Sequence, residues 1–308
     1  MKAAMMTSNG FVFEEVPVPK PGKGEVLIKS ISCGVCEGEV YRYRQMTSHP
    51  GEERLLLGHE GSGTVAAIGE GVLGWALGDV VTTSLGGAYA EYFVVAAERL
   101  LRLPKAISPE WAVGEAVACC AYSAKNARIE KGDAVAVVGC GFMGMLCIDF
   151  AKKLYGAGEV LAIEPVEWRL ALASCHGADS LSLAEKPEFA GRYDVVLEAA
   201  GVQAALDASA RMVAEHGRLT IVGYHQSDGG SRSVPMQIWN LKALEVTSGH
   251  CRKPLWKKDA LQGVLPLIAS GEVDVKGLVT PYPFESINQA FLDVINRKPG
   301  LMKAAVLF

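Results

Sequence analysis

The sequence predicts an α/β protein in which a doubly wound parallel sheet is joined to a second domain of short strands. From Asp133 onward, short apolar runs alternate with helical segments, which is the pattern of parallel strands with helical crossovers. Before that, the first hundred residues contain short strands separated by glycine and proline turns, which is typical of a barrel or a sandwich. At 308 residues the chain exceeds the usual size of one hydrophobic core, so two domains are expected.

Six strands are expected in the parallel sheet. The first two lie at 134–138 and 160–163, and both are apolar runs rich in β-branched residues. The other four are expected at 180–183, 195–198, 219–222 and 244–247, with helices at 168–176 and 204–213 between some of them.

The remaining elements lie on either side of this region. Ser108 and Pro109 have the character of a helix cap and a first helical residue, so a helical stretch is expected from there towards Ile129. After residue 251 we expect a helix, a proline-rich turn at 280–284, a second helix and a final strand at 303–308. The early strands are expected at 2–6, 11–16, 25–30, 63–68, 79–83 and 89–95.

The first parallel strand leads directly into a glycine motif. Gly139, Gly141 and Gly144 have the G-x-G-x-x-G spacing, in which the first glycine permits a tight turn and the second lets a pyrophosphate approach the backbone. The third lets the following helix pack closely on the strand, and the helix N-terminus then faces the phosphates. Glu164 ends the second strand, where a carboxylate can accept a hydrogen bond from a ribose hydroxyl. This arrangement predicts dinucleotide binding.

Composition narrows the range of partners. The formal net charge is −4 and no long basic block is present, so neither nucleic acid nor an anionic membrane is expected as a partner. No apolar run reaches membrane-spanning length, and the N-terminus does not read as a signal peptide. Eight cysteines scattered over the chain favour reduced thiols, and therefore a cytoplasmic location.

Two clusters in the first domain carry the residues that zinc prefers. The first, SCGVCEGEVYRY, contains Cys33, Cys36 and Glu39; the second, LLLGHEGSG, contains His59 and Glu60. A catalytic zinc ion uses three such ligands and keeps one position for water or substrate. Taken alone, the cysteine pair also suits a redox site or half of a zinc knuckle, but neither a thioredoxin-like pattern nor a second pair follows. A single histidine is more often a core or loop residue.

Six stretches carry a family resemblance in the same order along nearly the whole chain: CGVCEGEV, GHEGSGTVAAIGEGV, GDVV, GGAYAEYFVV, VVGCGFMG and VTPYPFESINQAF. They resemble the zinc-dependent medium-chain alcohol and polyol dehydrogenases. The resemblance implies a GroES-like, chaperonin-like β-barrel catalytic domain at 1–112 and 252–308. This domain is split around a Rossmann NAD-binding domain at 113–251, with one zinc ion in the cleft between them.

The resemblance also implies a set of metal ligands. Cys36 is similar to the family's thiolate ligand and His59 to its imidazole ligand, whereas Cys33 is not a ligand in that pattern. Glu60 matches a glutamate that lies near the metal and can replace its water, either as a ligand or in the surrounding shell.

The third ligand in this family is a cysteine or a glutamate on the helix that leads into the Rossmann domain. Glu115 lies at about the offset where polyol dehydrogenases place their glutamate, so it is the favoured residue. Cys119 and Cys120 compete with it, although buried small side chains on an alanine-rich helix are their simpler interpretation.

Three departures from the family pattern matter. Only seven residues separate Asp79 from Gly87, so the lobe that carries a structural zinc is missing and this is a short form with at most one zinc ion per chain. Gly38 replaces the hydroxyl residue that passes the alcohol proton outward, and Tyr41 replaces a histidine further along that relay. Glu39 replaces a shorter aspartate, but it can still accept the second ring N–H of the ligating histidine.

The activity implied by the resemblance is hydride transfer between NAD and a secondary alcohol, with zinc lowering the pKa of the substrate hydroxyl. Glu60, Tyr41 and zinc-bound water are the candidates for carrying the proton away, and Glu60 ranks first because it adjoins a ligand. The alternatives are a zinc-free quinone or enoyl reductase of the same fold and a non-catalytic dinucleotide-binding protein.

The coenzyme is expected to be NAD rather than NADP. Glu164 would repel a 2′-phosphate, which favours NAD. The nearby Arg169 could accommodate such a phosphate and therefore argues against this preference. The residues expected to contact the coenzyme are Gly139, Gly141, Phe142, Met143, Gly144, Glu164, Arg169, Gly223 and Tyr224.

Polar loops favour a substrate with many hydroxyl groups, such as a polyol, a sugar or a cyclitol, because each unpaired buried polar group costs free energy. The loops expected to border the substrate contain Glu37, Tyr41, Arg42, Tyr43, Tyr224, His225, Gln226, His250 and Arg252.

The resemblance implies a homodimer or homotetramer in which sheets join through the last strand at 244–247. Met236, Ile238 and Trp239 precede that strand and are candidates for the interface, with core packing as their alternative role.

Overall fold

The computed structural model describes residues 1–49, 51, 53–83, 87–111 and 114–308. These residues form two compact units. The first comprises Met1–Ala118, Lys253–Ser270 and Asp274–Phe308, and the second comprises Cys119–Arg252 with Gly271–Val273. The domain boundary expected between residues 112 and 113 falls on positions outside the described residues.

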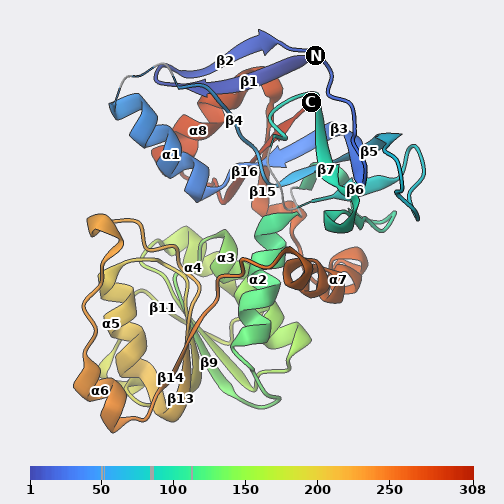
Figure 1. Cartoon of the computed structure of the whole chain (residues 1–308). Helices are drawn as coiled ribbons and strands as arrows, with labels where there is room; N and C mark the ends of the chain where they lie inside the picture. Colours follow the sequence, from blue (N-terminus) through green and yellow to red (C-terminus); the bar gives the residue numbers. More distant parts are fainter. Residues whose placement is uncertain (50, 52, 84–86, 112–113) are drawn as a thin grey trace. The chain divides into compact units, whose positions relative to one another are not determined.

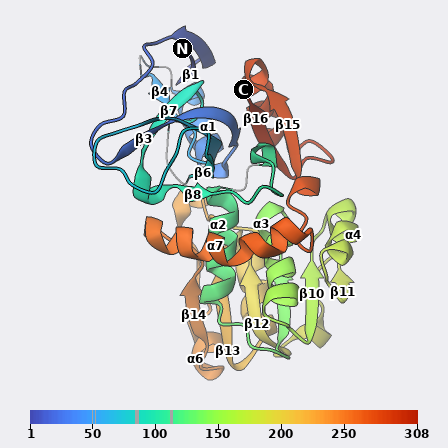
Figure 2. The same ribbon diagram turned by 90° about the vertical axis from the view of Figure 1, so that its right-hand side faces the viewer.

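The second unit is built on the six-stranded parallel sheet that the sequence predicts (Figure 2). Its strands pair in the order β11-β10-β9-β12-β13-β14, so the first strand in sequence, β9, lies in the middle. This is the 3-2-1-4-5-6 order of a doubly wound dinucleotide-binding sheet. The strands are β9 (Ala134–Val138), β10 (Glu159–Ile163), β11 (Ser180–Ser182), β12 (Tyr193–Glu198), β13 (Val213–Ile221) and β14 (Glu245–Ser248).

The strand order of this sheet reverses between β9 and β12. In open α/β sheets, ligands bind at the carboxyl ends of the strands at such a point. The glycine motif follows β9 there and leads into α3 (Phe142–Asp149), which continues as a π-helical turn, η3 (Phe150–Leu154). The remaining helical segments of this unit are α4 (Glu167–Cys175), η4 (Pro187–Phe189), α5 (Gln203–Met212), η5 (Asp228–Gly230) and α6 (Met236–Leu241).

The first unit contains the short strands expected from the sequence, arranged in two sheets. A three-stranded sheet has the order β2-β1-β4, and a larger one has the order β15-β16-β3-β5-β6-β8, with β7 also paired to β3. Its strands are β1 (Lys2–Thr7), β2 (Gly10–Glu15), β3 (Glu25–Gly34), β4 (Leu55–Leu56), β5 (Gly61–Ile68), β6 (Val80–Thr82), β7 (Tyr92–Ala96), β8 (Leu101–Arg102), β15 (Val279–Pro283) and β16 (Lys303–Leu307).

Helices α1 (Glu37–Ser48) and α8 (Ile287–Ile295) lie beside the β1–β2 hairpin in this unit (Figure 1). Aromatic rings connect these elements. The ring of Phe291 in α8 lies 4.7 Å from that of Phe11 in β2 and 5.4 Å from that of Tyr43 in α1. The other helical segments are η1 (Ala97–Arg99), η2 (Pro109–Trp111), α7 (Pro254–Ser270), η6 (Lys276–Leu278) and η7 (Phe284–Ser286), and α2 (Glu115–Asn126) begins in this unit.

Helix α1 is an element that the sequence analysis missed, since the first hundred residues were expected to contain strands alone. Its buried residues include Val40, Tyr43 and Met46, which recur every three positions and therefore share one helix face. Glu37 and Glu39 in the first turn interact favourably with the helix dipole. The helical period was therefore present in the sequence, within a region dominated by strands.

The helical stretch expected from Ser108 to Ile129 is also corrected. Two separate helices are present, η2 and α2, and residues 112–113 between them lie outside the described residues. Gly114 is not helical, and a Cβ atom there would lie 2.8 Å from Oγ1 of Thr82, the last residue of β6, and 2.7 Å from the carbonyl oxygen of Thr83. Helix α2 therefore begins only at Glu115, once the chain has passed this contact.

Residues 280–283 lie in strand β15 and Phe284 begins η7, so the proline-rich turn expected at 280–284 is corrected. Among the strands in the described ranges, β15 is at the edge of its sheet and pairs with β16 alone, which runs parallel to it. Proline is tolerated in edge strands because its missing N–H leaves no gap in an inner hydrogen-bond ladder. Pro281 and Pro283 are therefore compatible with a strand at this position.

Candidate metal centre and dinucleotide site

Three side chains with zinc-binding atoms converge in the first unit. Cys36 Sγ, a ring nitrogen of His59 and a carboxylate oxygen of Glu60 all lie within 4.8 Å of one another. Cys36 directly precedes α1, whereas His59 and Glu60 lie between β4 and β5. The fold thus brings together the two clusters singled out in the sequence, and thiolate, imidazole and carboxylate are all ligands of zinc.

Glycines make this convergence possible. Gly58 has a φ of +101°, and a Cβ atom there would lie 2.6 Å from the backbone nitrogen of Tyr89. Gly34 faces Glu60, where a Cβ atom would lie 2.0 Å from Oε2. Larger residues at these two positions would displace the turn that carries His59 or the carboxylate beside it.

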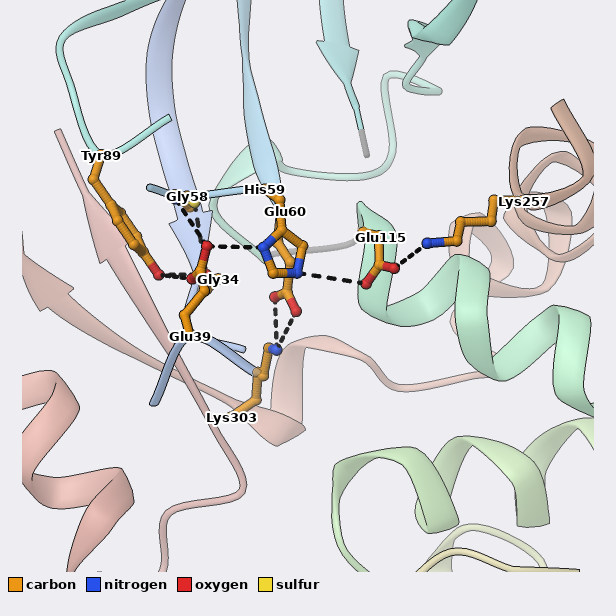
Figure 3. Close-up of polar contacts among 10 residues, drawn as sticks. Gly34, Glu39, Gly58, His59, Glu60, Tyr89, Glu115, Lys257 and Lys303 are labelled. Carbon is orange, nitrogen blue, oxygen red and sulfur yellow. Dashed lines mark hydrogen bonds and ion pairs between the residues drawn. The ribbon is translucent and has the colours of Figure 1, made fainter. Parts of the chain in front are cut away.

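Glu39 holds the imidazole of His59 (Figure 3). Its Oε1 accepts hydrogen bonds from His59 Nδ1 and from the backbone N–H of Gly58, both at 2.8 Å. The hydroxyl of Tyr89 donates to Oε2 at 2.7 Å. Because Nδ1 carries the proton in this arrangement, Nε2 offers its lone pair to a metal. The expected contact between Glu39 and the ring is present despite the longer side chain.

The electrostatics of His59 suit a neighbouring cation. Burial lowers the pKa of His59, but hydrogen bonds to Cys36 and Glu39, together with the charges of these two groups, outweigh it and raise the pKa to about 12. The imidazole therefore lies between two anionic groups. A divalent cation bound to these donors would satisfy the same charges in place of a second proton on the ring.

Two carboxylates beside His59 are each paired with a lysine (Figure 3). Glu115 is the first residue of α2, and its Oε2 lies 3.9 Å from His59 Nε2. Its Oε1 forms an ion pair with Lys257. Glu60 is 1% exposed, and its oxygens lie 2.7 and 2.6 Å from Lys303 Nζ. Glu115 lies outside the group of three donors whose ligand atoms are all within 4.8 Å of one another.

The charges of this centre match a divalent metal. The thiolate form of Cys36 and the carboxylates of Glu39, Glu60 and Glu115 would contribute four negative charges, and Lys257 and Lys303 offset two of them. Two negative charges remain, which equals the charge that one zinc ion neutralises. Burial lowers the pKa of Lys303, but the charges of Glu60, Cys36 and Glu115 raise it overall, so the lysine stays protonated.

The other cysteines do not join this cluster within the part of the chain that the structure describes. Cys33 is fully buried, its Sγ lies 3.6 Å from the carbonyl oxygen of Gly34, and burial raises its pKa. Cys33 and Cys36 are separate thiols, so they form no disulfide. Cys119 and Cys120 lie on α2, and Cys120 is buried.

The polar residues expected on α1 have different environments. Tyr41 is 41% exposed. Arg42 forms an ion pair with Glu53 at 2.7 Å. Tyr43 is buried, and its ring stacks on that of Phe11, so the expectation that Tyr43 borders the substrate with a polar group is wrong.

The three glycines of the motif occupy three different environments in the second unit. Gly139 has a φ of +97°, and a Cβ atom there would meet the backbone of Ala200 at 2.8 Å. At Gly144 a Cβ atom would lie 1.9 Å from the carbonyl oxygen of Gly139, so helix α3 packs directly against the turn. At Gly141, no atom of the described residues other than its neighbours in the chain lies within 4 Å of a Cβ position. This open space at the start of α3 suits a dinucleotide pyrophosphate.

Glu164 lies beside this turn, as the sequence indicates. Its Oε2 accepts a hydrogen bond from the backbone N–H of Cys140 at 2.8 Å, and Oε1 accepts one from Val166 at 3.1 Å. The carboxylate is buried and therefore rigidly held at the end of β10. The guanidinium of Arg169 stacks on the ring of Trp168 at 5.3 Å. Phe142 is buried and Met143 partly buried in the first turn of α3.

A hydrogen-bond network around the buried Glu198, at the end of β12, was not expected from the sequence. Glu198 accepts hydrogen bonds from the backbone N–H groups of Ala200 and Gly201, and its Oε2 lies 2.9 Å from His225 Nε2. Arg232 donates from Nε to His225 Nδ1 at 2.7 Å. The loop after β13, which includes Gly223 and Tyr224, is thereby tied to the loop after β12. The available signal was an acidic residue at a strand end with a glycine three residues later, Glu198 and Gly201.

Lys257, Lys303 and Tyr89 were also missed. Each is far in sequence from the residue that it contacts. No local pattern marks the two lysines, and Tyr89 lies in the stretch GGAYAEYFVV, which does not indicate a contact with Glu39. Only the tertiary contacts described above identify them.

Two family models match the chain. The alcohol dehydrogenase GroES-like domain matches residues 22–105, and the zinc-binding dehydrogenase domain matches residues 143–270. The first match lies in the unit that holds the Cys36–His59–Glu60 cluster, and the second covers most of the parallel sheet.

Relatives with a dehydrogenase name align along nearly their whole length. The chain is 29% identical to the L-threonine 3-dehydrogenase of Pyrococcus horikoshii, with 91% of this chain and 90% of that protein covered. It is also 29% identical to the sorbitol dehydrogenase of Halalkalibacterium halodurans, with 91% and 92% covered. Among solved structures, a short chain alcohol dehydrogenase from E. coli complexed with NADH has the same fold, with a TM-score of 0.87 and 22% identity over 100% of this chain and 99% of that one.

A doubly wound dinucleotide-binding sheet and a cysteine–histidine–glutamate cluster on a GroES-like domain define a zinc-binding dehydrogenase. The chain belongs to the zinc-dependent medium-chain dehydrogenase/reductase family, and within it to the alcohol and polyol dehydrogenases that use NAD(P). The family resemblance and the fold class predicted from the sequence are thereby confirmed.

Proposed function

We propose that this enzyme holds one zinc ion at Cys36 and His59 and uses NAD to oxidise a secondary alcohol of a polyhydroxylated compound to a ketone. The convergence of the Cys36, His59 and Glu60 donors within 4.8 Å carries this proposal. The absence of a structural-zinc lobe from the sequence supports one ion per chain rather than two.

The chain's own residues have distinct roles in the proposed site. A bound zinc ion supplies a Lewis acid that polarises the substrate oxygen. Cys36 and His59 hold the ion, and Glu39 fixes the tautomer and orientation of the imidazole. Glu115 is the proposed third ligand, because its Oε2 faces His59 Nε2 while Lys257 holds its Oε1.

Glu60 is the first candidate for moving the substrate proton. Its carboxylate adjoins His59, is nearly fully buried and has a protonated lysine, Lys303, at both oxygens. Tyr41 is the second candidate, and its exposed position on α1 would place it nearer to solvent.

NAD is the proposed coenzyme. The open position at Gly141 and the held carboxylate of Glu164 support a dinucleotide whose adenosine ribose carries no phosphate. The coenzyme contacts proposed besides these are Gly139, Phe142, Met143, Gly144, Arg169, Gly223 and Tyr224.

Glu164→Gln is expected to reduce the preference for NAD over NADP. The amide keeps the size of the side chain and can still accept the hydrogen bond from Cys140, but it no longer repels a 2′-phosphate. The ratio of kcat/KM values for the two coenzymes measures this preference. Equal efficiency with both coenzymes in the unmodified enzyme would show that NAD is wrongly assigned.

The proposed substrate class is a polyol, a sugar or a cyclitol. Polar side chains near the carboxyl ends of β13 and β14 support it: Tyr224 is exposed, its ring lies 5.7 Å from that of His250, and His250 Nε2 lies 3.3 Å from the carbonyl oxygen of Gly223. The relative named sorbitol dehydrogenase supports a polyol in addition.

Metal analysis followed by a substrate panel tests the proposed function. We expect about one zinc ion per chain, and a higher kcat/KM with NAD for polyols, sugars and inositols than for simple aliphatic alcohols. A protein without zinc that reduces a quinone or an enoyl compound would instead be the zinc-free reductase. A panel in which aliphatic alcohols are the better substrates would contradict the polyol assignment.

A homodimer or homotetramer is proposed, with β14 as the edge strand that meets its copy. Met236 and Leu241 on α6 are 53% and 71% exposed, whereas Trp239 packs against the core of the second unit and is therefore a weaker interface candidate. Light scattering at micromolar concentration tests this assembly, and a monomer would refute it.

The proposed location is the cytoplasm, supported by cysteines that occur as thiols, such as Cys33 and Cys36. None of the helices in the described ranges is both long and apolar enough to cross a bilayer.

A further inference from the structure

We propose that Tyr89 is a positioning residue of the metal centre, which acts on His59 through Glu39. This inference rests on the proposed zinc site and adds to it a group two hydrogen bonds away from the imidazole. The path runs from the Tyr89 hydroxyl to Glu39 Oε2 at 2.7 Å, and from Glu39 Oε1 to His59 Nδ1 at 2.8 Å (Figure 3).

The Tyr89 hydroxyl has two acceptors and one proton. Glu39 Oε2 lies at 2.7 Å and the carbonyl oxygen of Gly34 at 3.0 Å. A charged acceptor makes the shorter and stronger hydrogen bond, so the hydroxyl donates mainly to the carboxylate of Glu39. Tyr89 is fully buried, and burial raises the pKa of its hydroxyl well above the ordinary value, so the group remains a donor.

The carboxylate of Glu39 depends on this donor. Gly58 and His59 both donate to Oε1, whereas Tyr89 is the donor recorded at Oε2 within the described residues. Glutamate has one more rotatable bond than the aspartate of the family pattern, so its carboxylate needs an additional contact to stay in one orientation. Without the hydroxyl, Oε2 would be a buried charged acceptor lacking its partner, and rotation of the carboxylate would move the group that fixes the imidazole.

The Tyr89 ring has a separate packing role, which a suitable substitution leaves intact. It lies 5.7 Å from the ring of Phe11 and 5.9 Å from that of Phe291, in edge-on arrangements that phenylalanine can also adopt. Tyr89→Phe therefore removes the hydroxyl while keeping the aromatic contacts.

The same unit offers a matched control. Tyr282 is also buried, and its hydroxyl donates to Asp293 Oδ2 at 2.7 Å, but Asp293 is not among the contacts of the zinc-ligand cluster. Tyr282→Phe thus removes a buried tyrosine–carboxylate hydrogen bond of the same length. Both variants are expected to lose stability, and only one of them should change the metal centre.

The test measures the zinc dissociation constant of the full chain by competition with a chromogenic chelator. Removing a direct partner of a metal ligand, such as Glu39, usually weakens metal binding roughly 10- to 100-fold. Tyr89→Phe acts one hydrogen bond further out, so it is expected to weaken zinc binding by roughly 10-fold, at the lower end of that range, whereas Tyr282→Phe leaves it unchanged. Equal zinc affinity in the two variants would overturn the proposal.

A double-mutant cycle separates positioning from general destabilisation. Glu39→Gln keeps the side-chain shape but removes the charge, and it is expected to weaken zinc binding by itself. Adding Tyr89→Phe to Glu39→Gln should then have a clearly smaller effect than Tyr89→Phe alone, because both act along one path. Fully additive losses would refute the path. If Tyr89→Phe fails to fold, an unchanged zinc affinity in Glu39→Gln refutes it as well.

The unmodified protein distinguishes this inference from the proposed function. If it binds no zinc, the proposed function fails and the inference falls with it. If it binds zinc tightly and Tyr89→Phe binds equally well, the proposed function stands and the role of Tyr89 is refuted.

Discussion

Cys36→Ser is expected to remove the bound zinc and to lower kcat/KM for the alcohol roughly a thousandfold. A metal Lewis acid contributes several kcal/mol to such a reaction, and each 1.36 kcal/mol corresponds to a tenfold change in rate. Cys36 belongs to the group of three donors, and serine is a poor replacement for a thiolate ligand. Metal content and steady-state kinetics of the purified variant measure the two effects.

Cys33→Ala is the control for this substitution. Cys33 is three residues away and fully buried in β3, but it lies outside the donor group. We expect a lower melting temperature from the lost packing and an unchanged zinc content. Loss of zinc in Cys33→Ala to the same extent as in Cys36→Ser would show that the ligands are wrongly assigned.

Gly141→Ala is expected to raise the KM for NAD roughly a hundredfold without unfolding the protein. Apart from its chain neighbours, the part of the chain that the structure describes has no atom within 4 Å of the added methyl group, which therefore enters the space proposed for the pyrophosphate. Losing about two hydrogen bonds from backbone N–H groups to charged phosphate oxygens costs roughly 3 kcal/mol, which corresponds to about a hundredfold in affinity.

Gly144→Ala provides the contrast, because its methyl group would lie 1.9 Å from the carbonyl oxygen of Gly139. We expect it to lower stability by about 1–3 kcal/mol, since the helix must shift away from the turn, and to weaken NAD binding as a consequence. Thermal melts with and without NAD distinguish the two variants. A large loss of stability in Gly141→Ala, or a normal affinity for NAD, would contradict the proposed coenzyme position.

The sequence alone was informative wherever residues close in the chain determine the structure. The motif from Gly139 to Gly144, the acid at Glu164 and the alternation of strands and helices identify the parallel sheet, because a strand, its turn and its helix form one local unit. Helix α1 was the exception: its period of three was present, but short strands dominate the segment around it. Strand β15 was missed because proline suggests a turn unless the strand is known to be at an edge.

In the metal centre, the donor residues could be found from the sequence, whereas the residues that hold the donors in place could not. Cys36, His59 and Glu60 could be singled out from the sequence because zinc-binding residue types and glycine turns occur together there. Their convergence, the hydrogen bonds of Glu39 with Tyr89 and the ion pairs of Lys257 and Lys303 required the tertiary structure. Lys303 and Glu60 are separated by 243 positions, and no local pattern encodes a contact between a lysine near one end of the chain and a glutamate near the other. Charge pairing of this kind is decided by which strands become neighbours when the sheets form, and that depends on packing of the whole unit.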